Sequence, residues 1–405
     1  MNERTSPRED FDGRVGGRVG RLAPWLRPLA VVASCVVLGI APPALGEAIQ
    51  EDAKGEIAKP LPIAPQDTVA DVDREIVVCD TEAPPVAGAG VTSIFEPDSP
   101  PARQIRDLGW LVIAISAGIF LVVQTLLIVA IVRGVRARKR DAEGDPVQLH
   151  GSIPIEVAWT VIPVVIVFVL TMVTIRTIRD IDLTEAPEGA MEVVVIGHQW
   201  WWEFRYPSED GDNGKDVVVA NELHVPVGRP IWLRLESADV IHSFWVPRLA
   251  GKTDLIPGRT NYTWFEAERA GLYLGQCAEY CGTQHAHMLL RVYADPPDKF
   301  DAWLESQRTV ADSESTVEKG RRVFMQYACM NCHTIDGVSD GMFGPNLTHL
   351  ASRSTLASGM IPFNRENLRA WIDDPQAIKP GCNMPALKLD PDELDAVTDY
   401  LITLR

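Results

Sequence analysis

The sequence predicts a multidomain membrane protein with two transmembrane helices, a β-sandwich or barrel, and a helical C-terminal domain. Two apolar runs, residues 108–132 and 154–175, are each long enough to span a bilayer, which takes about 20 residues. Beyond residue 190, short β-rich runs alternate with Gly, Pro, Asn and Asp, and beyond residue 315 the pattern becomes helical. A chain of 405 residues is long enough for two or three such domains.

The N-terminus is typical of a secretory signal peptide over residues 1–46. Basic residues precede the apolar stretch 29–40, and small residues follow as far as Gly46. An uncleaved anchor and a lipid attached at Cys35 are the alternatives. The loop between the two spans carries five basic residues, Arg133, Arg136, Arg138, Lys139 and Arg140. The positive-inside rule therefore places this loop in the cytoplasm of a bacterium, and both chain ends on the periplasmic or outer side of the inner membrane.

The net charge is −17, which argues against nucleic-acid binding and suits an exposed acidic protein that meets basic partners. Asp, Glu and Pro concentrate in one segment near the N-terminus, which we expect to be extended. The predicted organisation is a signal peptide (1–46), an acidic Pro-rich N-terminal segment (47–104), a two-helix membrane anchor (105–182), a β-domain (188–296), a polar linker (297–315) and a helical domain (316–405).

Several elements can be predicted within the last two domains. The β-rich runs lie at 191–196, 216–227, 231–235, 262–266 and 288–293. Helices are expected at 317–328, from the N-cap Asn364 through Trp371, and after the N-cap Asp390 with Pro391 in the first turn. The last helix carries one apolar stripe, made of Leu394, Val397, Leu401 and Leu404.

The densest chemistry lies between Cys277 and Met288. Two thiols, Cys277 and Cys281, are followed by His285 and Met288, and His242 lies 35 residues before the first thiol. Thiolate and thioether ligands favour copper, and imidazole also suits it. Two thiolates can bridge two copper ions, each of which then takes a terminal imidazole. A disulfide and a zinc site are the alternatives, but neither accounts for His285 and Met288.

A second cofactor motif is Cys329-Met330-Asn331-Cys332-His333, a c-type haem attachment sequence. The thiols of Cys329 and Cys332 would add to the haem vinyl groups, and His333 would coordinate the iron. An electron carrier also needs a sixth iron ligand, which is commonly methionine. Met384, 51 residues after His333, is the predicted ligand, and Met342 is the alternative.

Residues 105–295 resemble subunit II of haem–copper cytochrome c oxidases. The resemblance rests on the second span, on GHQWWW (197–202), IHSFWVP (241–247) and KTDLIPGR (252–259), and on the copper loop. It implies a cupredoxin-like Greek-key β-sandwich whose two-copper centre, CuA, is bound by His242, Cys277, the Glu279 carbonyl, Cys281, His285 and Met288. It further implies magnesium on the Glu279 side chain, shared with subunit I, electron entry at Trp200, and Glu156 at the mouth of a proton channel.

Residues 315–405 resemble class I cytochromes c, an all-α fold, and the fusion resembles the caa3-type oxidases. The resemblance implies that electrons pass from cytochrome c or another donor, through the chain's own haem and the two-copper centre, to the haems of subunit I. There oxygen would be reduced to water with proton pumping, and other oxidase subunits would complete the complex. Alternatives are a subunit of another haem–copper complex, such as a nitric oxide reductase, and a copper assembly protein, which would need no haem.

Overall fold

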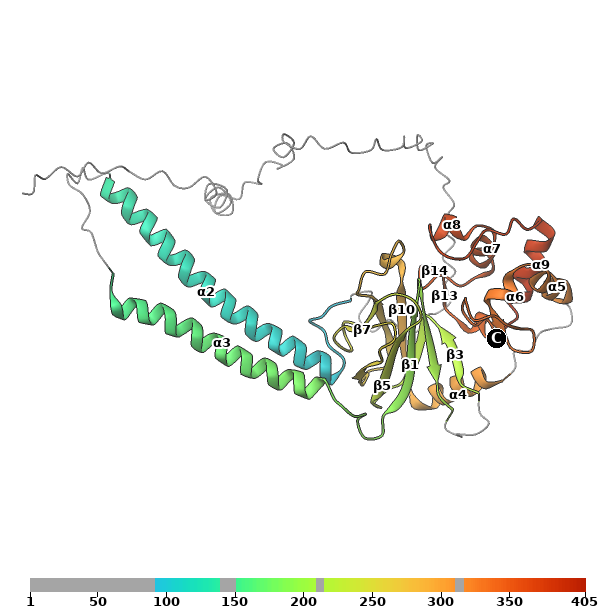
Figure 1. The fold of residues 1–405 in the computed structure, drawn as a ribbon, viewed down its shortest axis with the longest axis horizontal. Helices are drawn as coiled ribbons and strands as arrows, with labels where there is room; N and C mark the ends of the chain where they lie inside the picture. Colours follow the sequence, from blue (N-terminus) through green and yellow to red (C-terminus); the bar gives the residue numbers. More distant parts are fainter. Residues whose placement is uncertain (1–91, 139–150, 209–214, 310–316) are drawn as a thin grey trace, which may run out of the picture. The chain divides into compact units, whose positions relative to one another are not determined.

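The computed structural model describes residues 92–138, 151–208, 215–309 and 317–405 (Figure 1). The predicted signal peptide, most of the predicted acidic segment, Cys35 and Cys79 lie outside the described residues. Within the described part, the chain forms two long helices, a β-sandwich and a helical C-terminal domain. The fold class predicted from the sequence is therefore confirmed.

The two predicted spans are helices. Helix α2 (Pro100–Arg138) and helix α3 (Ile153–Ile181) contact each other and run antiparallel (Figure 1). The mean hydropathy of their most apolar windows is 2.6 and 2.5, and none of the side chains in those windows is buried. Apolar surface of this extent has to be covered by lipid or by other subunits.

The central domain is a sandwich of two five-stranded sheets. One sheet has the order β3-β2-β1-β5-β8 and the other β4-β10-β9-β6-β7. The strands are β1 (Met191–His198), β2 (Trp201–Tyr206), β3 (Val217–Ala220), β4 (Glu222–Pro226), β5 (Ile231–Ser237), β6 (His242–Trp245), β7 (Thr253–Leu255), β8 (Asn261–Phe265), β9 (Gly271–Cys277) and β10 (Leu289–Asp295). Both sheets are mixed, because β1 is parallel to β5 and β10 is parallel to β4.

The core of the sandwich lies between the two sheets. In β5 the side chains of Ile231, Leu233 and Leu235 are fully buried, whereas those of Arg234 and Glu236 are partly exposed. This alternation follows from the two-residue period of a strand, which points successive side chains to opposite faces. The buried faces of both sheets contribute to one apolar cluster, which also contains Cys277, Cys281 and Met288.

The run 216–227, expected as one strand, is divided at Asn221. Strand β3 pairs with β2, whereas β4 pairs with β10 in the other sheet. Asn221 has a φ of 64°, a left-handed conformation that asparagine tolerates better than most residues. Its side-chain oxygen accepts a hydrogen bond from the Trp202 backbone N–H at 2.9 Å. The chain therefore crosses from one sheet to the other at this residue.

The segment expected as a polar linker begins with helix α4 (Pro297–Arg308). Phe300 is buried in the sandwich core, and Trp303 and Leu304 pack against it. These three residues share one helix face, because they stand at i, i+3 and i+4. By its packing, residues 297–308 belong to the sandwich, and the polar composition of the segment concealed this short apolar stripe.

The C-terminal domain contains five helices among its described residues, with short strands between them. The helices are α5 (Glu318–Gln326), α6 (Cys329–Cys332), α7 (Arg365–Asp373), α8 (Pro375–Ile378) and α9 (Pro391–Leu401), and the two-residue strands are β11 (Thr334–Ile335), β12 (Ser339–Asp340), β13 (Thr355–Leu356) and β14 (Ile361–Pro362). The predicted caps are confirmed. Asn364 accepts a hydrogen bond from the Asn367 N–H at 2.7 Å, and the Glu393 carboxylate accepts from the Asp390 N–H at 3.3 Å.

Helices α5 and α9 cross at close range in this domain. All four residues of the predicted stripe on α9 and the adjoining C-terminus are buried. At the crossing, a Cβ added to Gly320 would lie 2.0 Å from the Ala396 carbonyl oxygen and 2.6 Å from the Tyr400 Cβ. Only glycine permits the two backbones to approach in this way.

We therefore expect Gly320→Ala to destabilise the C-terminal domain. In an unconstrained helix this change stabilises by about 1 kcal/mol. Here the added methyl group meets a backbone carbonyl that cannot rotate away, so a loss of about 1–3 kcal/mol is expected instead. Thermal unfolding followed by haem absorbance measures the effect. Arg322→Ala, on an exposed part of the same helix, is the control, and an unchanged melting temperature for Gly320→Ala would contradict the prediction.

Candidate copper and haem centres

The predicted copper ligands meet at one end of the sandwich. His242 begins β6 and Cys277 ends β9, and these strands are hydrogen-bonded neighbours in one sheet. Cys281 lies in the loop that follows β9. His285 begins the short 3₁₀ helix η2 (His285–His287), and Met288 stands between that helix and β10. The structure thus places the four loop donors beside the histidine from a separate strand.

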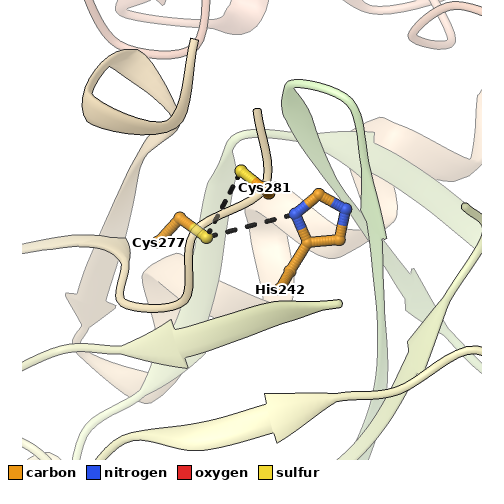
Figure 2. Close-up of side chains that lie close together, drawn as sticks. All are labelled: His242, Cys277 and Cys281. Atoms are coloured by element: carbon orange, nitrogen blue, oxygen red, sulfur yellow. Dashed lines mark hydrogen bonds between the residues drawn. The ribbon is translucent and has the colours of Figure 1, made fainter. Parts of the chain in front are cut away.

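The donor atoms lie within 4 Å of their neighbours. The two Sγ atoms are 3.8 Å apart, and the Cys277 Sγ is 4.0 Å from the His242 Nδ1 (Figure 2). The Cys281 Sγ is 3.7 Å from the His285 Nδ1 and 3.9 Å from the Met288 Sδ. A disulfide has an S–S distance of about 2.05 Å, so the two thiols are not bonded to each other.

The donor set fits two copper ions. The Glu279 carbonyl oxygen lies 3.2 Å from the Cys277 Sγ and is a sixth donor. A structural zinc ion takes four ligands in a closed tetrahedron, whereas this site offers six donors, of which two are thiols that can be shared. Thiolate, thioether and imidazole together are the combination that copper prefers.

The two thiols share their protons. Their mutual hydrogen bond lowers the pKa of Cys277 to about 3, against the opposing effect of burial. The same hydrogen bond, together with burial, raises the pKa of Cys281. The pair therefore loses its first proton much more readily than its second, and a bound metal would favour the loss of both.

The ring of His242 is oriented by a carboxylate. Its Nε2 lies 2.8 Å from the Asp239 Oδ1, which leaves Nδ1 facing the thiols. Burial opposes a charge on this ring, but the hydrogen bond to Asp239 raises the pKa of His242 overall. The ring also packs against Gly197, where an added Cβ would lie 2.7 Å from the His242 Cδ2. A carboxylate such as Asp239, bonded to the outer nitrogen of the ring, sets the tautomer of a metal-binding histidine.

Trp200 touches the copper loop directly. Its indole Nε1 donates a hydrogen bond to the Cys281 carbonyl at 2.8 Å, and the Gln199 side chain donates to the same oxygen at 2.7 Å. The Asp239 Oδ2 accepts from the Gln199 backbone N–H at 2.7 Å. The segment with the three tryptophans is thus bonded both to a predicted copper ligand and to the residue that orients His242.

The haem attachment sequence opens onto a cavity of about 200 Å³. Helix α6 places Cys329 and Cys332 one turn apart, and both line the cavity together with His333. Apolar side chains of the C-terminal domain form most of the remaining wall, among them Leu350, Leu356, Leu368, Ile372, Leu387 and Leu401. An apolar cavity that brings two thiols and an imidazole together fits a covalently bound haem.

A hydrogen bond to the backbone orients the His333 ring and leaves its Nε2 without this partner. Its Nδ1 lies 2.8 Å from the Pro345 carbonyl oxygen, so Nδ1 carries the proton and Nε2 is free. Burial lowers the pKa of His333, which favours the neutral, ligating form. Gly344 lies against the ring, and a Cβ there would be 2.6 Å from the His333 Cε1.

Met384 and Met342 differ in where they lie. Met384 lines the haem cavity, whereas Met342 is 77% exposed and is absent from the described cavity wall. The loop that carries Met384 is held by Gln376, whose side-chain Nε2 donates to the Met384 carbonyl at 2.9 Å and whose Oε1 accepts from the Gly381 N–H at 2.8 Å. Cys382 is a free thiol in this loop.

Glu156 and the side chain of Glu279, as distinct from its carbonyl group, lie outside both centres. Glu156 is exposed in the first turn of α3. The Glu279 side chain is partly exposed and lies 3.7 Å from the Lys252 Nζ, which also approaches the Asp254 carboxylate at 3.8 Å. His287, which lies between the loop donors His285 and Met288, bonds the Gln284 side chain at 2.8 Å.

Three residues outside the predicted ligand sets support these centres: Asp239, Gln199 and Gln376. Asp239 stands three residues before His242, and a carboxylate so close to a metal-binding histidine is a signal that the sequence offered. Gln199 bonds a carbonyl group of a distant segment, and Gln376 bonds one in the loop that follows its own helix. No spacing rule identifies such contacts before the fold is known.

The two apolar helices, the sandwich with its paired thiols and the helical domain with its attachment sequence define a membrane-bound electron-transfer protein. Three family models match the chain: the transmembrane domain of cytochrome c oxidase subunit II over residues 92–177, its periplasmic domain over 191–294, and cytochrome c over 317–405. The sandwich is accordingly cupredoxin-like, with CuA implied in it and haem implied in the C-terminal domain.

Named proteins are similar to this chain over most of their own length. Cytochrome c oxidase subunit 2 of Alkalihalophilus pseudofirmus is 36% identical over 321 residues, which cover 77% of this chain and 90% of the relative. That of Bacillus sp. (strain PS3) is 31% identical, with 67% and 80% covered. The periplasmic domain of subunit II of cytochrome oxidase of Bradyrhizobium japonicum is 34% identical with a TM-score of 0.28, covering 30% of this chain and 96% of that one. The chain belongs to the cytochrome c oxidase subunit 2 family, and it carries a fused C-terminal cytochrome c domain.

Proposed function

We propose that this chain takes electrons from an external donor and passes them through its own haem c and its copper pair to the haems of subunit I. The position of Trp200 is the observation that supports electron transfer from the haem to the copper pair. The Trp200 indole donates a hydrogen bond to the carbonyl of the copper-loop residue Cys281, and Trp200 also lines the haem cavity. One side chain therefore bridges the two centres.

The residues around each centre have separate tasks in this route. When bound, the haem and the copper pair each take up and release one electron. Cys329 and Cys332 would hold the haem in its domain, and the fusion of this domain to the sandwich keeps the carrier close to its acceptor. Cys277 and Cys281 would supply the two thiolates that both copper ions share, and sharing would spread the change of charge over both metals. Asp239 bonds the His242 Nε2 and so orients the ring with Nδ1 toward the thiols.

Met384 is the proposed sixth ligand of the haem iron. It shares the haem cavity with His333, and its loop is held by Gln376. Methionine opposite histidine raises the reduction potential of a haem, which favours a carrier that collects electrons from another protein. The exposure of Met342 supports the choice between the two methionines.

The Glu279 carboxylate is the proposed ligand of a magnesium ion at the border with subunit I. Magnesium in proteins is held by one or two carboxylates and several waters, and Asp254 approaches the same lysine as Glu279. Glu156 is proposed to mark the mouth of a proton channel that subunit I completes. Its exposed position at the start of a membrane helix supports this role.

The proposed setting is a bacterial inner membrane crossed by α2 and α3, with the sandwich and the cytochrome domain on the periplasmic or outer side. Arg133, Arg136 and Arg138 at the end of α2 support a cytoplasmic loop. The net charge of −17 suits a basic donor such as a soluble cytochrome c.

Purification of the oxidase complex from the native membrane tests the proposal. We expect haem that stays bound to this chain after denaturation, a mixed-valence copper signal, and oxygen uptake with reduced cytochrome c as donor. A complex that contains the chain but lacks either cofactor signal would overturn the proposed function. Reduction of nitric oxide in place of oxygen would assign the chain to a different haem–copper complex.

A further inference from the structure

The face of the sandwich around Trp200 is covered by the chain's own cytochrome domain. The Ser358 hydroxyl donates to the Trp200 carbonyl at 2.7 Å, and the Asn383 side chain donates to the Gln199 carbonyl at 2.9 Å. The Gln284 side chain donates to the Pro380 carbonyl across the same junction. The contacts therefore surround the residue that bridges the two centres.

Lys379 lies at the centre of these contacts. It follows helix α8 directly, and it is 3% exposed although lysine is among the residues that are rarely buried. Its Nζ donates to the Trp200 carbonyl at 2.8 Å, to the His287 carbonyl at 3.1 Å and to the Ser358 hydroxyl at 2.8 Å. Because an ammonium group has three N–H donors, every one of them has a partner.

The origin of the three acceptors shows what Lys379 stabilises. Only Ser358 belongs to the cytochrome domain, whereas the carbonyl groups of Trp200 and His287 belong to the sandwich. A lysine that served only the fold of its own domain would find its acceptors there. Desolvation lowers the pKa of Lys379 to about 7, so its burial has a cost that the three acceptors have to offset.

We propose that Lys379 is a positioning residue that docks the cytochrome domain on the Trp200 face of the sandwich and so sets the rate of electron transfer between the two centres. The proposal rests on the function proposed above. Transfer across this face oxidises the haem iron by one electron and reduces the copper pair by one, and no bond or proton is exchanged. Electron transfer is sensitive to distance, so a loosened junction slows it even when both centres are intact.

The test uses the purified oxidase complex with Lys379→Met. This change keeps an unbranched apolar side chain and removes only the ammonium group. Lys319→Met is the matched control, because the Lys319 Nζ donates to the Asp392 carbonyl within the cytochrome domain, at 3.2 Å. Both variants are examined by their haem and copper spectra, by hydrogen exchange of residues 199–202 and 376–384, and by the rate of copper reduction after rapid reduction of the haem.

For Lys379→Met we expect unchanged spectra, at least about tenfold faster hydrogen exchange at both segments, and at least about tenfold slower copper reduction. Lys319→Met should match the wild type in all three. Normal exchange and a normal rate in Lys379→Met, with both spectra intact, would overturn the proposal. Missing cofactor signals in the wild-type complex would instead overturn the proposed function.

Ser358→Ala keeps the test decisive if Lys379→Met fails to fold. It removes the hydroxyl that accepts from Lys379 and donates to the Trp200 carbonyl, and leaves the lysine in place. We expect the same direction of change in exchange and in rate, with a smaller size. Wild-type behaviour of a folded Ser358→Ala, together with loss of fold in Lys379→Met, would assign Lys379 to domain stability and reject the docking role.

Discussion

Replacement of Cys277 by serine is expected to abolish the two-copper centre and leave the covalent haem in place. The Cys277 thiol has three of the other donors within 4.0 Å: the His242 Nδ1, the Glu279 carbonyl oxygen and the Cys281 Sγ. A serine oxygen in its place is a hard ligand that copper does not prefer. Without the bridging sulfur, the two metals lose the ligand that they share. We expect the mixed-valence copper signal to disappear and oxygen uptake to fall more than about a hundredfold.

Electron paramagnetic resonance and copper analysis of the purified complex measure this loss, and haem absorbance shows that the rest of the chain has folded. Cys382→Ser is the matched control, since Cys382 is a free thiol of the cytochrome domain and none of the proposed copper ligands. It should keep both signals. A normal copper signal in Cys277→Ser would show that the paired thiols are not the bridges.

The second large effect is expected for Met384→Ala. The haem should remain attached through Cys329 and Cys332, because these bonds do not involve the iron. Loss of the thioether should remove the spectral features of His–Met ligation and lower the reduction potential, since methionine raises it. Electron transfer from the haem to the copper pair should then become less favourable, and turnover should fall at least about tenfold.

Met342→Ala is the control for Met384→Ala, because Met342 is the alternative sixth ligand of the haem iron. Met342 is 77% exposed, so its replacement should leave the haem spectrum and potential unchanged. Optical and redox titrations of both variants decide the assignment. An altered spectrum in Met342→Ala, together with a normal spectrum in Met384→Ala, would transfer the sixth ligand to Met342.

Local patterns in the sequence were sufficient for much of the fold. Two apolar runs predicted helices α2 and α3, and the caps Asn364 and Asp390 predicted where α7 and α9 begin. The pattern failed where long-range packing decides the structure. The run 216–227 is continuous in β propensity, yet the two halves belong to different sheets because Asn221 turns the chain between them.

The two centres show the same division. Both thiol pairs, His285, Met288 and His333 could be chosen because ligands that lie close in the chain have a recognisable spacing. Asp239 could have been predicted from its position three residues before His242. Gln199 and Gln376 could not, since only the folded chain shows which carbonyl groups their side chains reach. Lys379 was not distinguishable from a surface lysine until its three acceptors were known.

The sequence by itself determined the two membrane helices, the soft donors of the copper loop and the haem attachment site, because each depends on one continuous stretch of chain. Only the tertiary structure decided that His242 meets the loop from another strand, that α4 packs on the sandwich, and that Trp200 lies between copper loop and haem cavity. These placements depend on which apolar faces pack together, and that choice is made by the whole chain rather than by any local pattern.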